Sequence, residues 1–115
     1  MRSCLVCKIP VRESVCEHCL AGLFRMREPF HREEDGVAVR ALFSWHESTE
    51  RALPWLVHSL KGQADARVWR PLATMMVHVL GLPQAEALIP IPSDHARGLA
   101  GALSALTGIP VRAVA

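Results

Sequence analysis

The chain has 115 residues, half of them hydrophobic, which suits one compact domain, or a small module on a modest core, and argues against global disorder. Its formal net charge of +2 is too small to indicate a nucleic-acid partner by itself. Residues 1–20 carry cysteines, charges and a proline where a secretory signal needs an unbroken apolar stretch. A membrane-spanning helix needs roughly 20 apolar residues, and the longest apolar region, Pro71–Pro83, is shorter and is interrupted by His78. We therefore expect a cytoplasmic protein without a membrane segment.

The first feature along the chain is a group of four cysteines, Cys4, Cys7, Cys16 and Cys19, arranged as two C-x2-C pairs. Each pair can occupy a tight turn that aims both sulfurs at one point, and two such turns complete a tetrahedron of thiolates around zinc. In a reducing compartment such cysteines bind metal more often than they form disulfides. Disulfides and an iron–sulfur or redox role are the alternatives, and His18 is a weaker candidate ligand. The pattern predicts a structural zinc knuckle of the zinc-ribbon type over residues 1–24.

The next stretch predicts a short helix near residues 20–24 and then a linker over residues 25–36. This linker is indicated by its mixture of both charge signs with proline and glycine. Its basic residues could contact nucleic acid, but a solvated connector explains them better because Glu33, Glu34 and Asp35 offset their charge. Alternating apolar residues from Val37 to Trp45 then predict a strand.

Two helices are expected after this strand. The first is capped by Ser48 or Thr49 and reaches Leu60, with Pro54 predicting a late or kinked start. A second helix runs over residues 65–80, opened by an aspartate and closed by Gly81. Pro71 lies inside this segment and predicts a bend or a broken first turn.

The last part of the chain reads as strand, helix, strand. Residues 87–92 are apolar and branched, which predicts a buried strand, and residues 111–114 predict a second one. Between them, a helix capped by Ser93 or Asp94 should bury Leu99, Leu103 and Leu106 and approach a sheet through its small residues. This order predicts one parallel crossover unit. So few strands would leave the edge of the sheet uncovered, so residues 37–115 are expected to form only a partial α/β domain.

A candidate anion site lies where the strand over residues 87–92 meets the helix. Ligands of open α/β sheets bind beyond the carboxyl ends of strands, and the unpaired N–H groups of a helix N-terminus favour an anion. Ser93 could donate a hydrogen bond there, and His95 and Arg97 could add positive charge. Asp94 as a cap beside two solvated basic residues is the alternative that requires no ligand. Lys61 is either a charge at a helix C-terminus or a further anion contact.

Four motifs in this order resemble the amino-terminal half of the ComF family, which comprises bacterial phosphoribosyltransferase-like proteins linked in some species to natural competence and the use of external DNA. The motifs are the cysteine knuckle, Ser59-Leu60-Lys61-Gly62, Leu88-Ile89-Pro90-Ile91-Pro92, and Asp94-His95-Ala96 opening a helix with Leu99-Ala100. The resemblance implies a small zinc ribbon followed by an incomplete type I phosphoribosyltransferase-like α/β core. It also implies that Ser93, Asp94, His95 and Arg97 match the loop that contacts the pyrophosphate of phosphoribosyl pyrophosphate.

Two departures from the family pattern limit the expected activity. The basic segment after the Pro-x-Pro strand is shortened here to Ser93-Asp94-His95-Ala96. The acidic pair followed by a Thr-Thr-Gly-like loop, which holds the ribose and 5′-phosphate in the family, has no counterpart. We therefore expect no phosphoribosyl transfer by this chain alone; binding of phosphoribosyl pyrophosphate with Mg would require a complete core, supplied by a missing carboxyl-terminal half or a protein partner.

Two other hypotheses remain open from the sequence. One is a non-enzymatic zinc-ribbon module for protein or nucleic-acid contact, although the low charge and few aromatic residues favour nucleic acid only weakly. The other is a degenerate relative that regulates or pairs with a complete enzyme through an exposed sheet edge.

Overall fold

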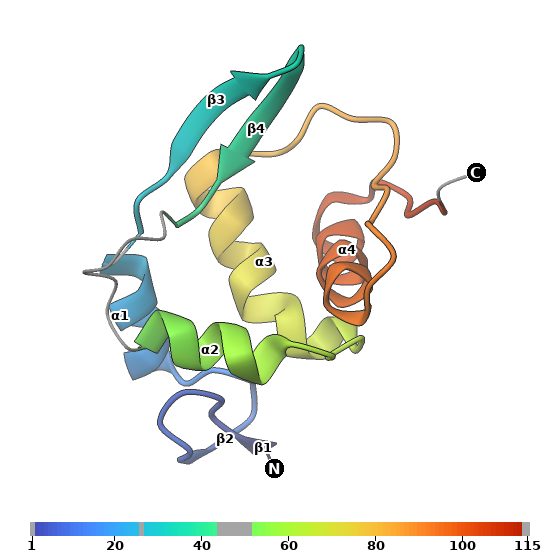
Figure 1. Ribbon diagram of the computed structural model, residues 1–115. Coiled ribbons are helices and arrows are strands. Elements are labelled where there is room, and N and C mark those ends of the chain that lie inside the picture. Colours follow the sequence, from blue (N-terminus) through green and yellow to red (C-terminus); the bar gives the residue numbers. More distant parts are fainter. Residues whose placement is uncertain (1, 26, 44–51, 114–115) are drawn as a thin grey trace.

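The computed structural model describes residues 2–25, 27–43 and 52–113, and this part of the chain is a mixed α/β structure. Figure 1 shows α3 (Ala66–Leu80) in the middle of the molecule between α1 (Glu17–Arg25) and α4 (Asp94–Thr107). The short helix α2 (Ala52–Leu60) crosses below them. The described residues also form two small antiparallel sheets, each with two strands.

The amino-terminal knuckle is closed by the first of these sheets. Strand β1 (Arg2–Ser3) pairs with β2 (Pro10–Val11), and the first C-x2-C turn lies between them. One buried cluster then joins the knuckle to the helices, so the knuckle shares its core with the rest of the described chain. The buried members of this cluster are Cys4, Val15, Cys16, Leu23, Leu42, Leu56, Leu60, Leu72 and Met75.

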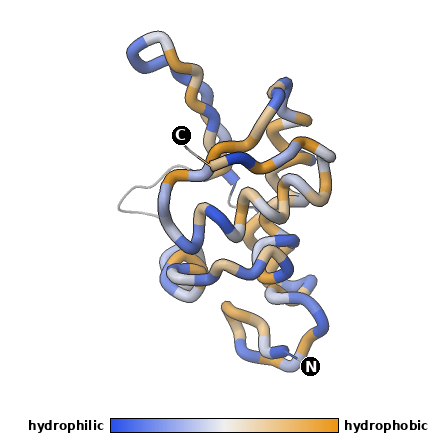
Figure 2. The backbone as a smooth tube through the Cα atoms, turned by 90° about the vertical axis from the view of Figure 1, so that its right-hand side faces the viewer, coloured by the Kyte–Doolittle hydropathy of each residue, from blue (hydrophilic) through white to orange (hydrophobic). Residues whose placement is uncertain are grey.

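The expected linker over residues 25–36 contains a strand. Strand β3 (Phe30–Glu34) pairs with β4 (Val37–Ala41) in an antiparallel hairpin whose last pair joins Glu34 to Val37. Asp35 and Gly36 form the turn with φ values of 50° and 78°, the left-handed pair that a two-residue hairpin turn of type I′ requires. The strand expected over residues 37–45 ends at residue 41, and residues 44–45 lie outside the described part. Figures 1 and 2 show this hairpin standing away from the helices, with a hydrophilic tip.

Helix α3 follows its sequence signals closely. The Asp65 carboxylate caps it by accepting a hydrogen bond of 2.9 Å from the Arg67 N–H, and Gly81 ends it with a φ of 84°. Pro71 lies within one continuous helix, so the expected break of the first turn does not occur. Helix α2 ends at Leu60 as predicted, whereas its expected caps at residues 48–49 lie outside the described residues.

Helix α4 packs against α3 through its small residues, which corrects the expected approach to a sheet. A Cβ at the buried Gly98 would lie only 2.4 Å from Cδ1 of Trp69, and one at Gly101 would lie 3.2 Å from the Ala66 Cβ. The expected buried leucine face is only partly covered, with Leu106 43% exposed. Small residues take the interface because the Trp69 indole fills the space between the two helix backbones.

The expected crossover appears as a single parallel bridge between Leu88 and Val111, which flank α4 in sequence. The Leu88 N–H donates to the Pro110 carbonyl at 2.8 Å, and the Arg112 N–H donates to the Leu88 carbonyl at 2.9 Å. Alternate residues of a strand face the same neighbour, so the next hydrogen bond would need an N–H of Pro90 to donate to the Arg112 carbonyl, and proline has no N–H. The pairing therefore stops after one residue, and the described chain forms no parallel sheet here.

No helix among the described residues is both long and apolar enough to cross a membrane.

Candidate metal centre

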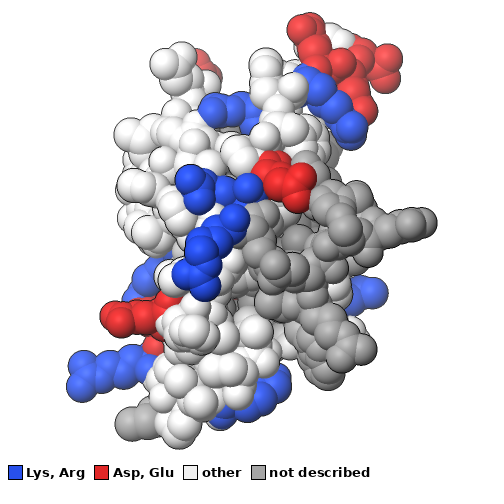
Figure 3. Space-filling model, turned by 90° about the vertical axis from the view of Figure 1, so that its left-hand side faces the viewer, with Lys and Arg blue, Asp and Glu red and all other residues white. Residues whose placement is uncertain are grey.

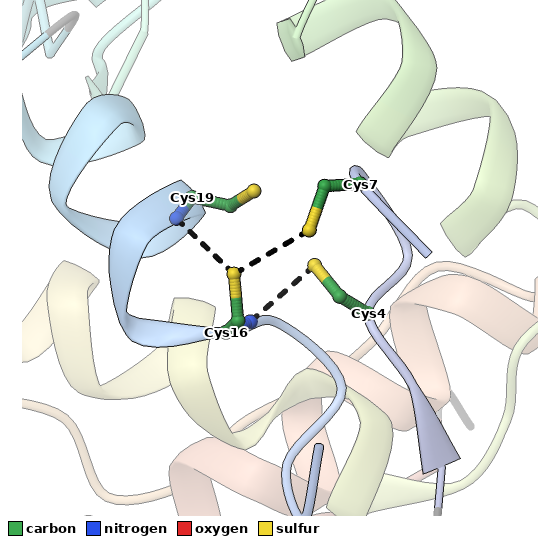
Figure 4. Close-up of side chains that lie close together, drawn as sticks. All are labelled: Cys4, Cys7, Cys16 and Cys19. Carbon is green, nitrogen blue, oxygen red and sulfur yellow. Dashed lines mark hydrogen bonds between the residues drawn. The ribbon is translucent and has the colours of Figure 1, made fainter. Parts of the chain in front are cut away.

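The four cysteines come from two adjacent segments and point toward one another. Figure 4 shows Cys4 and Cys7 on the turn after β1, Cys16 just before α1, and Cys19 in the first turn of α1. The first turn is tight: the Cys4 N–H donates to the Ile9 carbonyl at 2.8 Å. The short turn and the helix start thus each supply two sulfurs to one point, as the spacing predicts.

The geometry of the sulfurs fits a single tetrahedral metal ion. All four Sγ atoms lie within 4.8 Å of one another, and those of Cys7 and Cys16 are 3.6 Å apart. Zinc–sulfur bonds of about 2.3 Å in a tetrahedron place the sulfurs about 3.8 Å apart. The four thiols are free of disulfides, and their positions would admit an ion such as zinc with little adjustment.

Backbone N–H groups are directed at two of the sulfurs. The N–H groups of Val6 and Cys16 each donate to the Cys4 sulfur at 3.4 Å, and the Cys19 N–H donates to the Cys16 sulfur at the same distance. Such hydrogen bonds stabilise a thiolate because they place positive partial charge beside it. They also hold the ligands in place before an ion arrives.

The acid–base properties of the group differ from one thiol to another. Burial raises the pKa of Cys4, but N–H groups of Cys16, Cys7 and Val6 outweigh this effect and lower it to about 6. Burial, followed by the hydrogen bonds of Cys16, Cys7 and Cys4, raises the pKa of Cys19. Without a metal the cluster thus retains protons on some sulfurs, and an ion bound by all four must displace them.

Two hydroxyl groups attach the knuckle to the helices, and sequence reasoning missed both. The buried Ser14 hydroxyl donates to the Val68 carbonyl of α3, and the Ser59 hydroxyl of α2 donates to the Leu5 carbonyl at 3.4 Å. An exposed ion pair of 3.4 Å also joins Arg70 of α3 to Glu13, the residue before Ser14. Neither serine has a local sequence signal, because its partner lies far away in the chain.

His18 lies outside the sulfur cluster. His18 is exposed. Within the described ranges, the only group of three or more potential metal ligands consists of the four cysteines. The arrangement therefore supplies four thiolates and leaves no open coordination position, which is typical of a structural site.

The four residues of the predicted anion site make separate contacts and do not form one group. Ser93 caps α4, and its hydroxyl oxygen accepts a hydrogen bond from the Ala96 N–H at 3.2 Å. Asp94 and Arg97 form an exposed ion pair with each other. His95 takes part in neither contact and lines a cavity together with Lys61. Anion binding by the set of four stays a prediction, with three of its members already engaged in other contacts.

Positive and negative side chains are intermixed on one face of the described part of the chain. On the face shown in Figure 3, Lys and Arg side chains lie in small groups with Asp and Glu side chains beside them. The described part of this face carries no extended basic surface, and nucleic-acid binding stays a prediction.

Comparison with known proteins gives no relative: no family model, no curated sequence and no solved structure matches this chain.

Proposed function

We propose that Cys4, Cys7, Cys16 and Cys19 bind one structural zinc ion. The observation that carries this proposal is the convergence of four free sulfurs within 4.8 Å, with N–H groups directed at two of them. Zinc suits the site because four thiolates in a tetrahedron match its preferred ligands and geometry. A site closed by four protein ligands stabilises structure and leaves no position for a substrate.

The role of the ion is to fix the knuckle on the helical part of the chain. Cys4 and Cys16 belong to the same buried cluster as Leu56 and Leu72, so the metal ligands are also part of the core. The knuckle is too short to build a separate core of its own, and metal binding contributes about 10–16 kcal/mol in small zinc peptides. The ion thus supplies folding energy that so short a segment could not obtain by itself.

The test is the metal content of purified protein and of two variants. We expect one zinc ion per chain in the natural sequence and its loss in Cys16→Ser, because a hydroxyl replaces a buried thiolate ligand. Replacing the metal with Co²⁺ should give the absorption of a tetrahedral tetrathiolate site.

The matched control is His18→Ala, which removes a potential ligand between Cys16 and Cys19 without touching the sulfur cluster. This variant should keep its zinc and its Co²⁺ spectrum. Zinc retained by Cys16→Ser, or lost by His18→Ala, would contradict the proposed set of ligands.

For the protein as a whole we propose a ComF-like, phosphoribosyltransferase-family role, with the link to competence or DNA uptake that the family implies. One support is the order of the four motifs. The other is the parallel pairing of Leu88 with Val111 on either side of α4, since the chain runs from Leu88 to the Ser93 cap at the start of that helix. On this proposal the chain binds pyrophosphate at residues 93–97 and does not catalyse phosphoribosyl transfer.

Pyrophosphate titration of the ¹⁵N-labelled chain tests this role. We expect saturable shifts in the amide resonances of residues 93–97 and no turnover of phosphoribosyl pyrophosphate with Mg²⁺. Saturable binding should be weaker in Arg97→Met. Unchanged amide resonances at residues 93–97 would refute the proposed role, while the zinc site would be unaffected.

A further inference from the structure

A cavity of about 330 Å³ lies between α2, α3 and the beginning of α4. Its volume is within the range of roughly 300–1,000 Å³ that small-molecule sites occupy. The Trp69 indole forms a fixed wall, because its Nε1–H donates to the Gln63 carbonyl at 2.8 Å and Gly98 packs closely against it. The other principal apolar walls are Leu56, Leu60 and Leu72.

Two polar residues, Lys61 and His95, are among those that line this otherwise apolar cavity. Lys61 directly follows α2, and His95 lies in the first turn of α4. Within the described part of the chain neither side chain has a hydrogen-bonding or ion-pair partner, and no lining residue is acidic. The start of α4 adds the positive partial charge of a helix N-terminus.

We propose that this cavity binds a small organic anion whose carboxylate is attached to an aromatic or aliphatic body. The apolar walls would hold the body, while the Lys61 ammonium and an N–H of the His95 imidazole would hold the carboxylate. The volume equals about eleven water molecules at about 30 Å³ each, which suits a compact molecule.

This site differs from the anion site predicted from the sequence. The engaged residues Ser93, Asp94 and Arg97 take no part in it. The ligand also needs an apolar body, which pyrophosphate lacks. The proposal does not depend on the ComF-like role.

The experiment is a titration of the full ¹⁵N-labelled chain, with the indole N–H resonance of Trp69 as reporter, assigned through Trp69→Phe. The probe is 3-phenylpropionate, compared with its neutral analogue 3-phenylpropanamide and with acetate, which has no apolar body. We expect saturable shifts with 3-phenylpropionate, binding of the amide at least tenfold weaker, and no saturation with acetate in the same concentration range.

Two variants locate the anion. Lys61→Met removes the charge of an exposed side chain but keeps its apolar stem. This variant should bind 3-phenylpropionate about tenfold more weakly, with an unchanged thermal unfolding temperature. Arg32→Met removes an exposed positive charge from the β3–β4 hairpin, away from the cavity. It is the matched control and should bind as the natural chain does. Equal affinity for the acid and the amide, no effect of Lys61→Met, or an equal loss in Arg32→Met would each overturn the proposal.

Discussion

Gly98 is the residue on which the contact between α3 and α4 depends most directly. An added Cβ would lie 2.4 Å from Cδ1 of Trp69 and 2.6 Å from the Gln63 carbonyl oxygen. The indole cannot easily move aside, because its N–H is bonded to that same carbonyl. A single missing methyl group thus sets the distance between two helices.

We expect Gly98→Ala to lower the free energy of unfolding by about 1–3 kcal/mol, the usual cost of overpacking a core. This loss exceeds the gain of about 0.5–1 kcal/mol that alanine brings to a helix interior. Urea denaturation measures the change.

Gly22→Ala in α1 is the control for this substitution. A Cβ there meets only the end of the Arg25 side chain at 3.9 Å, so the helix-propensity gain should dominate and stability should rise. A Gly98→Ala variant as stable as the natural chain would show that α4 can shift away from Trp69.

At the scale of elements, boundaries with a local chemical cause were predictable. Asp65 opens α3 and Ser93 opens α4 by accepting backbone N–H groups, and Gly81 and Gly108 end these helices with positive φ. Each signal acts within a few residues and needs no tertiary partner.

The hairpin shows how a local signal can be read wrongly. An Asp-Gly pair between two potential strands is the strongest short-range indication of a type I′ turn, and Asp35-Gly36 forms one. The charges of the flanking residues favoured a linker instead. Those charges are compatible with a strand because nearly all of the hairpin is solvent-exposed.

The face that α4 buries could not be predicted from α4 alone. Leu99, Leu103 and Leu106 lie on one face of the helix, Gly98 and Gly101 lie on another, and either face can be buried. The choice was decided by Trp69 on another helix, which admits only small residues, and by the Pro90 position, which limits the strand pairing beside the leucines.

At the scale of the whole molecule, the metal site and the hydrophobic core are one unit. Cys4 is fully buried and shares a cluster with residues of α2 and α3. The Ser14 and Ser59 hydroxyls add hydrogen bonds between the knuckle and these helices. Loss of the ion should therefore affect helices that contain no ligand.

We expect a strong zinc chelator to shift one cooperative unfolding transition to lower urea concentration and to reduce amide-exchange protection in α3 as well as in the knuckle. Without the ion, Cys4 and Cys16 no longer hold this side of the core together. Hydrogen exchange resolved by residue gives the measurement.

The Cys16→Ser variant is the control, since a chain that cannot hold zinc should not respond to the chelator. Loss of protection confined to residues 2–19, with α3 unchanged, would show that the knuckle unfolds independently and would contradict the shared core.

The sequence by itself determined the cysteine cluster and the caps of α3 and α4, because each depends on residues close together in the chain. The tertiary structure alone decided which face of α4 is buried, how Ser14 and Ser59 attach the knuckle, and that Lys61 and His95 share a cavity. These contacts join distant segments, and their energies depend on shape and distance in space. A one-dimensional pattern records the chemistry of each side chain but not the neighbour it will meet.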